Sequence, residues 1–104
     1  MRVAIIDLIR EIRAAETAVI DDAVRQVRSR LSAVVSRVVN GARTGSEEAL
    51  YSLVVAQLSE GVIPQYLPAE AISAQRSSWT QQIVSRLSAA IRSKLDFRLS
   101  FDLE

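Results

Sequence analysis

The first part of the chain contains no residue that would interrupt a helix, since neither glycine nor proline occurs from Met1 to Val39. In the second half of this run, apolar residues recur at alternating spacings of four and three. This is the heptad pattern of helices that pack along one seam. The heptad seam comprises Ile20, Val24, Val27, Leu31, Val34 and Val38.

The length of this first helix restricts how the chain can fold. A continuous helix over residues 3–39 would be about 55 Å long, whereas a compact chain of 104 residues is about 35 Å across. The helix is therefore expected either to overhang its own domain or to break. Asp21-Asp22 is the expected break, because aspartate can cap the start of a new helix.

One charged residue interrupts the apolar stripe of this helix. Glu16 lies between Ile12 and Ile20, where the helical period calls for an apolar side chain. Either the helix contacts nothing or bends at this point, or Glu16 is a polar seam residue that fixes the register of a partner helix.

Ser46 followed by Glu47 and Glu48 predicts the start of a second helix. A serine hydroxyl can accept from the free backbone N–H groups of a first turn, and acidic residues there complement the helix dipole. We expect this helix to run to about Ser59 and to end before Gly61. Little of its surface is polar, which is typical of a buried element.

A third helix is expected from Pro68 to about Leu95, because proline suits the first position of a helix. One face of it carries Ile72, Trp79, Ile83, Leu87, Ile91 and Leu95. These elements predict a mainly α-helical chain that forms one domain over residues 1–104.

Residues 95–104 alternate apolar and polar side chains without exception, which is the period of a half-buried β-strand. We therefore expect a C-terminal β-strand. A single strand leaves N–H and C=O groups unpaired along both edges, so it needs a partner. The candidate partners are residues 2–6 of the same or another chain, the same strand in another copy, and a sheet edge in a different protein.

The composition removes most of the side chains that carry catalysis. The chain has no cysteine and no histidine, which excludes thiolate and imidazole chemistry. It has no glycine-rich phosphate-binding loop, and its acidic residues are dispersed. We expect no enzymatic activity, no cofactor and no metal site.

The sequence contains no recognisable membrane or export segment. No apolar run approaches the roughly 18 residues of a membrane span, and no small-residue cleavage site follows the apolar start of the chain. We expect a soluble protein without a membrane partner or a signal peptide, located in the cytoplasm or within an assembled particle.

The long first helix and the unpaired strand both predict a homo-oligomer, in which the seam packs as a coiled coil and the strand joins subunits. The favoured function is a non-enzymatic structural protein, such as a subunit of a larger particle or complex. An adaptor that adds its strand to another protein is an alternative. The residues expected to mediate self-association are Ile20, Val24, Val27, Leu31, Val34, Val38, Leu95, Phe97, Leu99, Phe101 and Leu103.

Nucleic-acid binding is a further alternative. The net charge of +1 provides no global field, but residues 23–45 carry five arginines and no acid. The candidate arginines fall on both sides of the apolar seam, which argues partly against a single contact face. The candidate contacts are Arg25, Arg28, Arg30 and Arg37.

Overall fold

Helices make up most of the described part of the chain. The computed structural model describes residues 2–43 and 45–103, with side chains for residues 5–43 and 45–99. No β-strand occurs among these residues, so the mainly α-helical prediction is confirmed. The elements are α1 (Arg2–Gly41), α2 (Glu47–Gln57), the π-helix η1 (Leu58–Val62), the 3₁₀-helix η2 (Ile63–Tyr66) and α3 (Ser73–Leu103).

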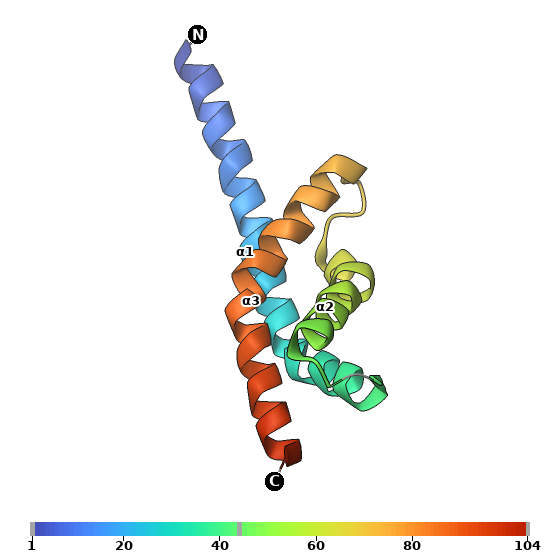
Figure 1. The fold of residues 1–104 in the computed structure, drawn as a ribbon. Coiled ribbons are helices and arrows are strands. Elements are labelled where there is room, and N and C mark those ends of the chain that lie inside the picture. The colour runs from blue at the N-terminus through green and yellow to red at the C-terminus, as the bar shows by residue number, and fades with distance from the viewer. Residues whose placement is uncertain (1, 44, 104) are drawn as a thin grey trace.

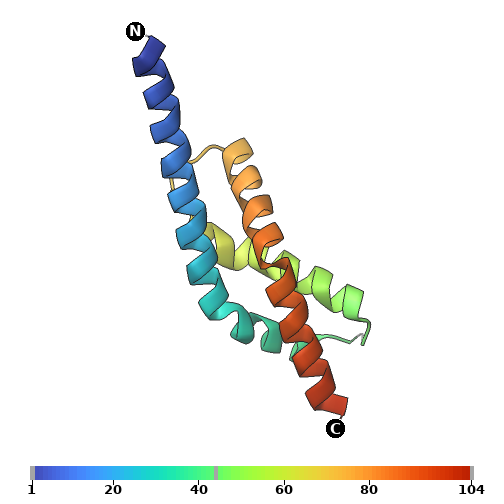
Figure 2. The same ribbon diagram turned by 90° about the vertical axis from the view of Figure 1, so that its left-hand side faces the viewer.

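The two long helices, α1 and α3, pack side by side and run in the same direction (Figure 1, Figure 2). α2 crosses them, and η1 and η2 continue from its end. The molecule is elongated, with extents of 65 × 21 × 19 Å. The N-terminal end of α1 (blue) extends past the other elements at one end, which confirms that the first helix overhangs the rest of the chain.

α1 is one continuous helix and does not break at Asp21-Asp22. The two carboxylates form ion pairs instead: Asp21 pairs with Arg86 of α3, and Asp22 pairs with Arg25 one turn further along α1. The helix therefore runs straight through the expected break and bends only near its C-terminal end (Figure 2).

α2 begins where the sequence predicts, because Ser46 Oγ accepts a hydrogen bond from the N–H of Ala49 at 3.4 Å. After Gln57 the chain widens into the π-helix η1, which the sequence did not predict. Its wider turn brings residues five apart towards one face, and Leu58 and Ile63 are both fully buried. The π-helix thus keeps both side chains in the core.

α3 begins at Ser73, later than the expected start at Pro68. Pro68 instead opens a turn in which its carbonyl accepts a hydrogen bond from the N–H of Ala71 at 3.2 Å. Arg76, in the first turn of α3, donates to the carbonyls of Pro68 and Ala71 at 2.8 and 3.2 Å. Because one side chain binds both carbonyls, this turn remains outside the helix.

A hydrophobic core joins α1, α2 and α3. The predicted apolar face of α3 is buried from Trp79 to Leu95, whereas Ile72 precedes the helix and is 69% exposed. Only apolar residues are buried among those that the structure describes. The buried residues are Ile20, Ala23, Val24, Val27, Leu31, Val34, Val35, Leu50, Val54, Leu58, Ile63, Leu67, Trp79, Ile83, Leu87, Ile91 and Leu95.

The expected C-terminal strand is not found, because α3 continues as a helix through Leu103. Residues 2–6, its expected partner within the chain, likewise belong to α1. The alternating pattern also contains a spacing of four, from Leu95 to Leu99, which continues the spacing of Ile91 and the earlier core residues of α3. Leu95 is fully buried and Leu99 packs partly buried against the core. Core packing thus favours the helical period over the strand period.

Candidate self-association surface

The heptad seam of α1 is used inside the folded chain. Its first five members, from Ile20 to Val34, are at most 7% exposed, and Val38 is partly buried against the same core. These side chains face α2 and α3 and not the solvent, and Leu95 of α3 is buried in the same core. Six of the residues expected to mediate self-association are therefore buried in the folded chain.

Most of the large apolar side chains that remain exposed lie on the N-terminal arm, which we define as residues 2–19 of α1. All described side chains from residue 5 to residue 15 are exposed. The five large apolar side chains among them are 45–60% exposed. They are Ile5, Ile6, Leu8, Ile9 and Ile12.

Four of these residues form a continuous apolar stripe. Leu8 and Ile9 follow Ile5 by three and four residues, and Ile12 follows them by four and three. Positions with these spacings share one face of an α-helix. In both views the arm projects away from α2 and α3 (Figure 1, Figure 2). We call these four residues the arm stripe. It has the spacing of a helix–helix seam, but no helix in the described part of the chain covers it.

The charges of the arm are balanced. Asp7 and Glu11 are matched by Arg10 and Arg13, and all four side chains are exposed. An α-helix with this composition presents both signs of charge beside its apolar stripe, and this distinguishes it from a purely basic or purely acidic surface.

Glu16 and Val19 mark the junction between the arm and the rest of the molecule. Both are half-buried, and the first buried residue, Ile20, follows directly. Glu16 lies in line with the arm stripe, one turn after Ile12, and it forms no ion pair among the described residues. The arm stripe and the buried seam are thus separated by one acidic position.

At the other end of the molecule, the remaining candidates for self-association differ in exposure. Phe97 is 69% exposed on α3, and Leu99 packs against the core. The side chains of Phe101 and Leu103 lie outside the described residues. The two leucines that bracket Phe97 thus belong to the core of the same chain.

The four candidate nucleic-acid contacts are exposed but dispersed. Arg25 pairs with Asp22, and the Arg30 guanidinium lies 5.9 Å from the ring centroid of Tyr66. Arg37 lines a hollow beside α2, on a different side of α1 from Arg25 and Arg28. The structure therefore does not gather these arginines on one stripe.

An arginine of α3 ties α2 to the core. Arg92 donates a hydrogen bond to Glu48 at 3.0 Å, and its guanidinium lies 4.1 Å from the ring centroid of Tyr51. The hydrogen bond that Arg92 donates to the Glu48 carboxylate raises the pKa of Arg92 above its ordinary value. The Tyr51 hydroxyl lies 3.0 Å from Ser88 Oγ, in hydrogen-bond contact. These contacts join α2 to α3 and do not involve the arm.

The arm stripe is not among the contacts predicted from the sequence. The recurrence of Ile5, Ile9 and Ile12 was visible in the sequence, but it could not show that this face remains uncovered. That property depends on where α3 begins and how far it reaches along α1, which only the tertiary structure shows.

No family, curated protein or solved structure matches this chain in the three comparisons with known proteins. Among the described residues, no group of three or more metal-ligating side chains comes together. No helix in the described part of the chain is both long and apolar enough to cross a membrane.

Proposed function

We propose that this protein is a non-enzymatic assembly protein whose N-terminal arm binds the arm of a second copy. The single observation that supports the proposal is the arm stripe. It consists of four large apolar side chains at helix-seam spacing on a projecting helix, and no other element among the described residues covers it. Exposed apolar surface of this kind is typical of an interaction site.

The charges beside the stripe favour a second copy over other partners. An arm that lay on a lipid surface or along nucleic acid would carry an excess of arginine or lysine. Here the sequence of the arm carries three acidic residues and three arginines. A surface with both signs of charge can pair with itself, because each copy supplies both partners for ion pairs at the rim.

The size of the stripe predicts an association that depends on protein concentration. Full burial of an exposed leucine or isoleucine contributes about 1.5–3 kcal/mol, and the arm residues are 45–60% exposed. Each side chain of the stripe can therefore contribute about half that amount. Summed over two arms, these contributions are comparable with the free-energy cost of association, about 4–15 kcal/mol. We therefore expect a dimer that dissociates on dilution, unless further contacts contribute.

Sedimentation equilibrium of matched variants tests the proposal. Ile9→Glu places a charge in the stripe, and Leu53→Glu places the same charge on α2 at a residue with the same exposure, 45%. The proposal expects Ile9→Glu to remain a monomer where the unsubstituted chain and Leu53→Glu are dimers. Circular dichroism checks that both variants remain helical. Equal masses for the two variants would overturn the proposal.

Two further binding measurements distinguish self-association from binding to nucleic acid or to lipid. If the unsubstituted chain remains a monomer and shifts an oligonucleotide at low salt, and Arg25→Ala/Arg28→Ala abolishes the shift, the nucleic-acid alternative is favoured. If the chain remains a monomer and Ile9→Glu abolishes binding to neutral vesicles, the stripe binds lipid.

A further inference from the structure

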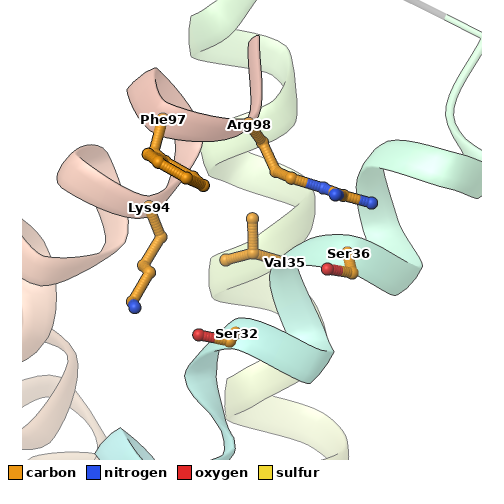
Figure 3. A pocket seen from close by; sticks show the side chains of 6 residues that line it. All are labelled: Ser32, Val35, Ser36, Lys94, Phe97 and Arg98. Carbon is orange, nitrogen blue, oxygen red and sulfur yellow. The ribbon is translucent and has the colours of Figure 1, made fainter. Parts of the chain in front are cut away.

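A small pocket opens between α1 and α3 at the end of the molecule away from the arm (Figure 3). It has a volume of about 160 Å³. A cavity of about 150 Å³ is large enough for a molecule the size of benzene. Its lining consists of Ser32, Val35 and Ser36 from α1 and Lys94, Phe97 and Arg98 from α3.

The polar lining of the pocket contains two hydroxyls and two cations but no acid. Ser32 and Ser36 lie four residues apart on α1, and Lys94 and Arg98 lie four residues apart on α3. Each pair therefore shares one face of its helix, and the two faces meet at the pocket. Hydroxyl groups and cationic side chains are the donors that proteins use to hold oxyanions.

The two cations of this pocket differ from the other cations of α3. Arg86 and Arg92 pair with carboxylates, and Arg76 binds backbone carbonyls. Lys94 and Arg98 form no ion pair with any side chain that the structure describes. Like charges four residues apart on a helix repel each other, so an anion in the pocket would relieve this repulsion.

Arg98 carries a second indication of a missing partner. Its Nε is buried and has no hydrogen-bond partner among the described residues. A buried donor without a partner is costly, and native structures seldom leave one unpaired. An anion held by this guanidinium, or a Ser36 hydroxyl turned towards it in the bound state, would satisfy the donor.

The arrangement of the side chains indicates the shape of the anion. The Arg98 guanidinium extends towards Ser36 on one side of Val35, and the Lys94 ammonium extends towards Ser32 on the other side (Figure 3). Val35 is 1% exposed and forms an apolar floor between them, with the Phe97 ring above. The pocket thus presents two cation–hydroxyl pairs separated by an apolar centre.

We propose that this pocket binds a small organic dianion: two carboxylates joined by a short apolar body. One carboxylate binds Arg98 and Ser36, the other binds Lys94 and Ser32, and the body lies over Val35. The two negative charges of the ligand match the two cations of the site. This site does not depend on the arm and stands apart from the proposed self-association.

The test is a titration of the chain with glutarate. Binding is monitored through the changes in amide chemical shift in ¹H–¹⁵N spectra. Butyrate is the matched control, because it has a similar apolar body but only one carboxylate. We expect saturable shifts around residues 32–36 and 94–98, and affinity for glutarate that is about tenfold higher than for butyrate, since a second charge-assisted interaction is made. Equal affinity for the two acids, or shifts without saturation, would overturn the proposal.

Four single variants show whether these residues bind the ligand. Arg98→Gln and Lys94→Gln should each weaken glutarate binding about tenfold, while Arg37→Gln, which removes a cation elsewhere on α1, should not. Asp102 follows Arg98 by four residues in the sequence. Asp102→Asn should therefore retain or strengthen binding. Equal weakening by Arg37→Gln, or loss of binding in Asp102→Asn, would contradict the assignment.

Discussion

The arm and the body of α1 carry the same kind of apolar stripe in one continuous helix but differ in what covers it. We use "body" for residues 20–95, which contain all the buried residues of the core. In the body, Val27 and Leu31 are fully buried against the rest of the chain, whereas in the arm Ile5 and Ile9 are 60% and 45% exposed. Helical periodicity thus identifies which residues favour burial, but not which surface buries them.

This difference implies two levels of local stability in one helix. A helix of the arm's length is only marginally stable in water without tertiary contacts. The body, in contrast, unfolds only when its core is exposed. The arm is therefore expected to gain most of its stability from a partner.

The largest effect is expected in hydrogen exchange at low protein concentration. Amides of residues 23–35 should exchange on the order of a thousandfold more slowly than amides of residues 5–15, because exchange in the body requires global unfolding. Mass spectrometry of peptic fragments measures both regions in one experiment. Equal protection of the two regions in the monomer would mean that the arm is stable by itself, and the comparison would fail.

Truncation of a core residue should lower the free energy of unfolding more than truncation of an arm residue. Leu31→Ala is expected to lower the free energy of unfolding by about 2–5 kcal/mol, because it leaves a cavity in the core. Ile9→Ala, on the exposed arm, should change it by about 0.5 kcal/mol or less in the monomer. Urea denaturation followed by circular dichroism measures both values. A loss for Ile9→Ala as large as that for Leu31→Ala would show that the arm is part of the core.

The junction between the two regions offers a way to strengthen the arm contact. Glu16→Leu extends the arm stripe towards Ile20 and should raise the association constant by about tenfold, since an added leucine becomes available for burial. Thr17→Leu is the control, because residue 17 is exposed and lies about 100° further round the helix. Sedimentation equilibrium compares the two variants. No change in association for Glu16→Leu would argue that the contact ends before this position.

The smallest change in the free energy of unfolding is expected when an exposed ion pair is removed. Asp21–Arg86 links α1 to α3 at the surface, so Arg86→Ala should lower the free energy of unfolding by about 0.2–1 kcal/mol. Arg25→Ala removes a pair within α1 and should cost no more than that. Thermal denaturation at low and high salt measures both, and the loss should shrink as salt increases. A loss well above 1 kcal/mol for Arg25→Ala would contradict this ranking.

Much of the fold was predictable from local signals. The absence of glycine and proline before Asn40 predicted the long helix, Ser46 predicted the start of α2, and the spacing from Trp79 to Leu95 predicted the buried face of α3. Each of these signals acts within one or two helical turns, so a single sequence is sufficient to detect it.

The errors arose where two local patterns competed or where the tertiary structure decided the outcome. Leu95 and Leu99 fit both a strand period and a helical spacing of four, and only the core of α3 selects the helix. Asp21-Asp22 can cap a helix, but the pairing of Asp21 with Arg86 depends on the register of α1 against α3. The sequence analysis could not detect the pocket of Lys94 and Arg98 for the same reason.

The most direct test of arm-to-arm association uses the absence of cysteine from the sequence. A single Ile9→Cys substitution introduces the only thiol, near the middle of the arm stripe, where two arms in either relative direction bring the same position together. Under mild oxidation, the account predicts rapid formation of a covalent dimer by Ile9→Cys and not by Leu53→Cys, which places the thiol on α2. Equal rates of cross-linking for the two variants, or no covalent dimer from Ile9→Cys at high protein concentration, would contradict it.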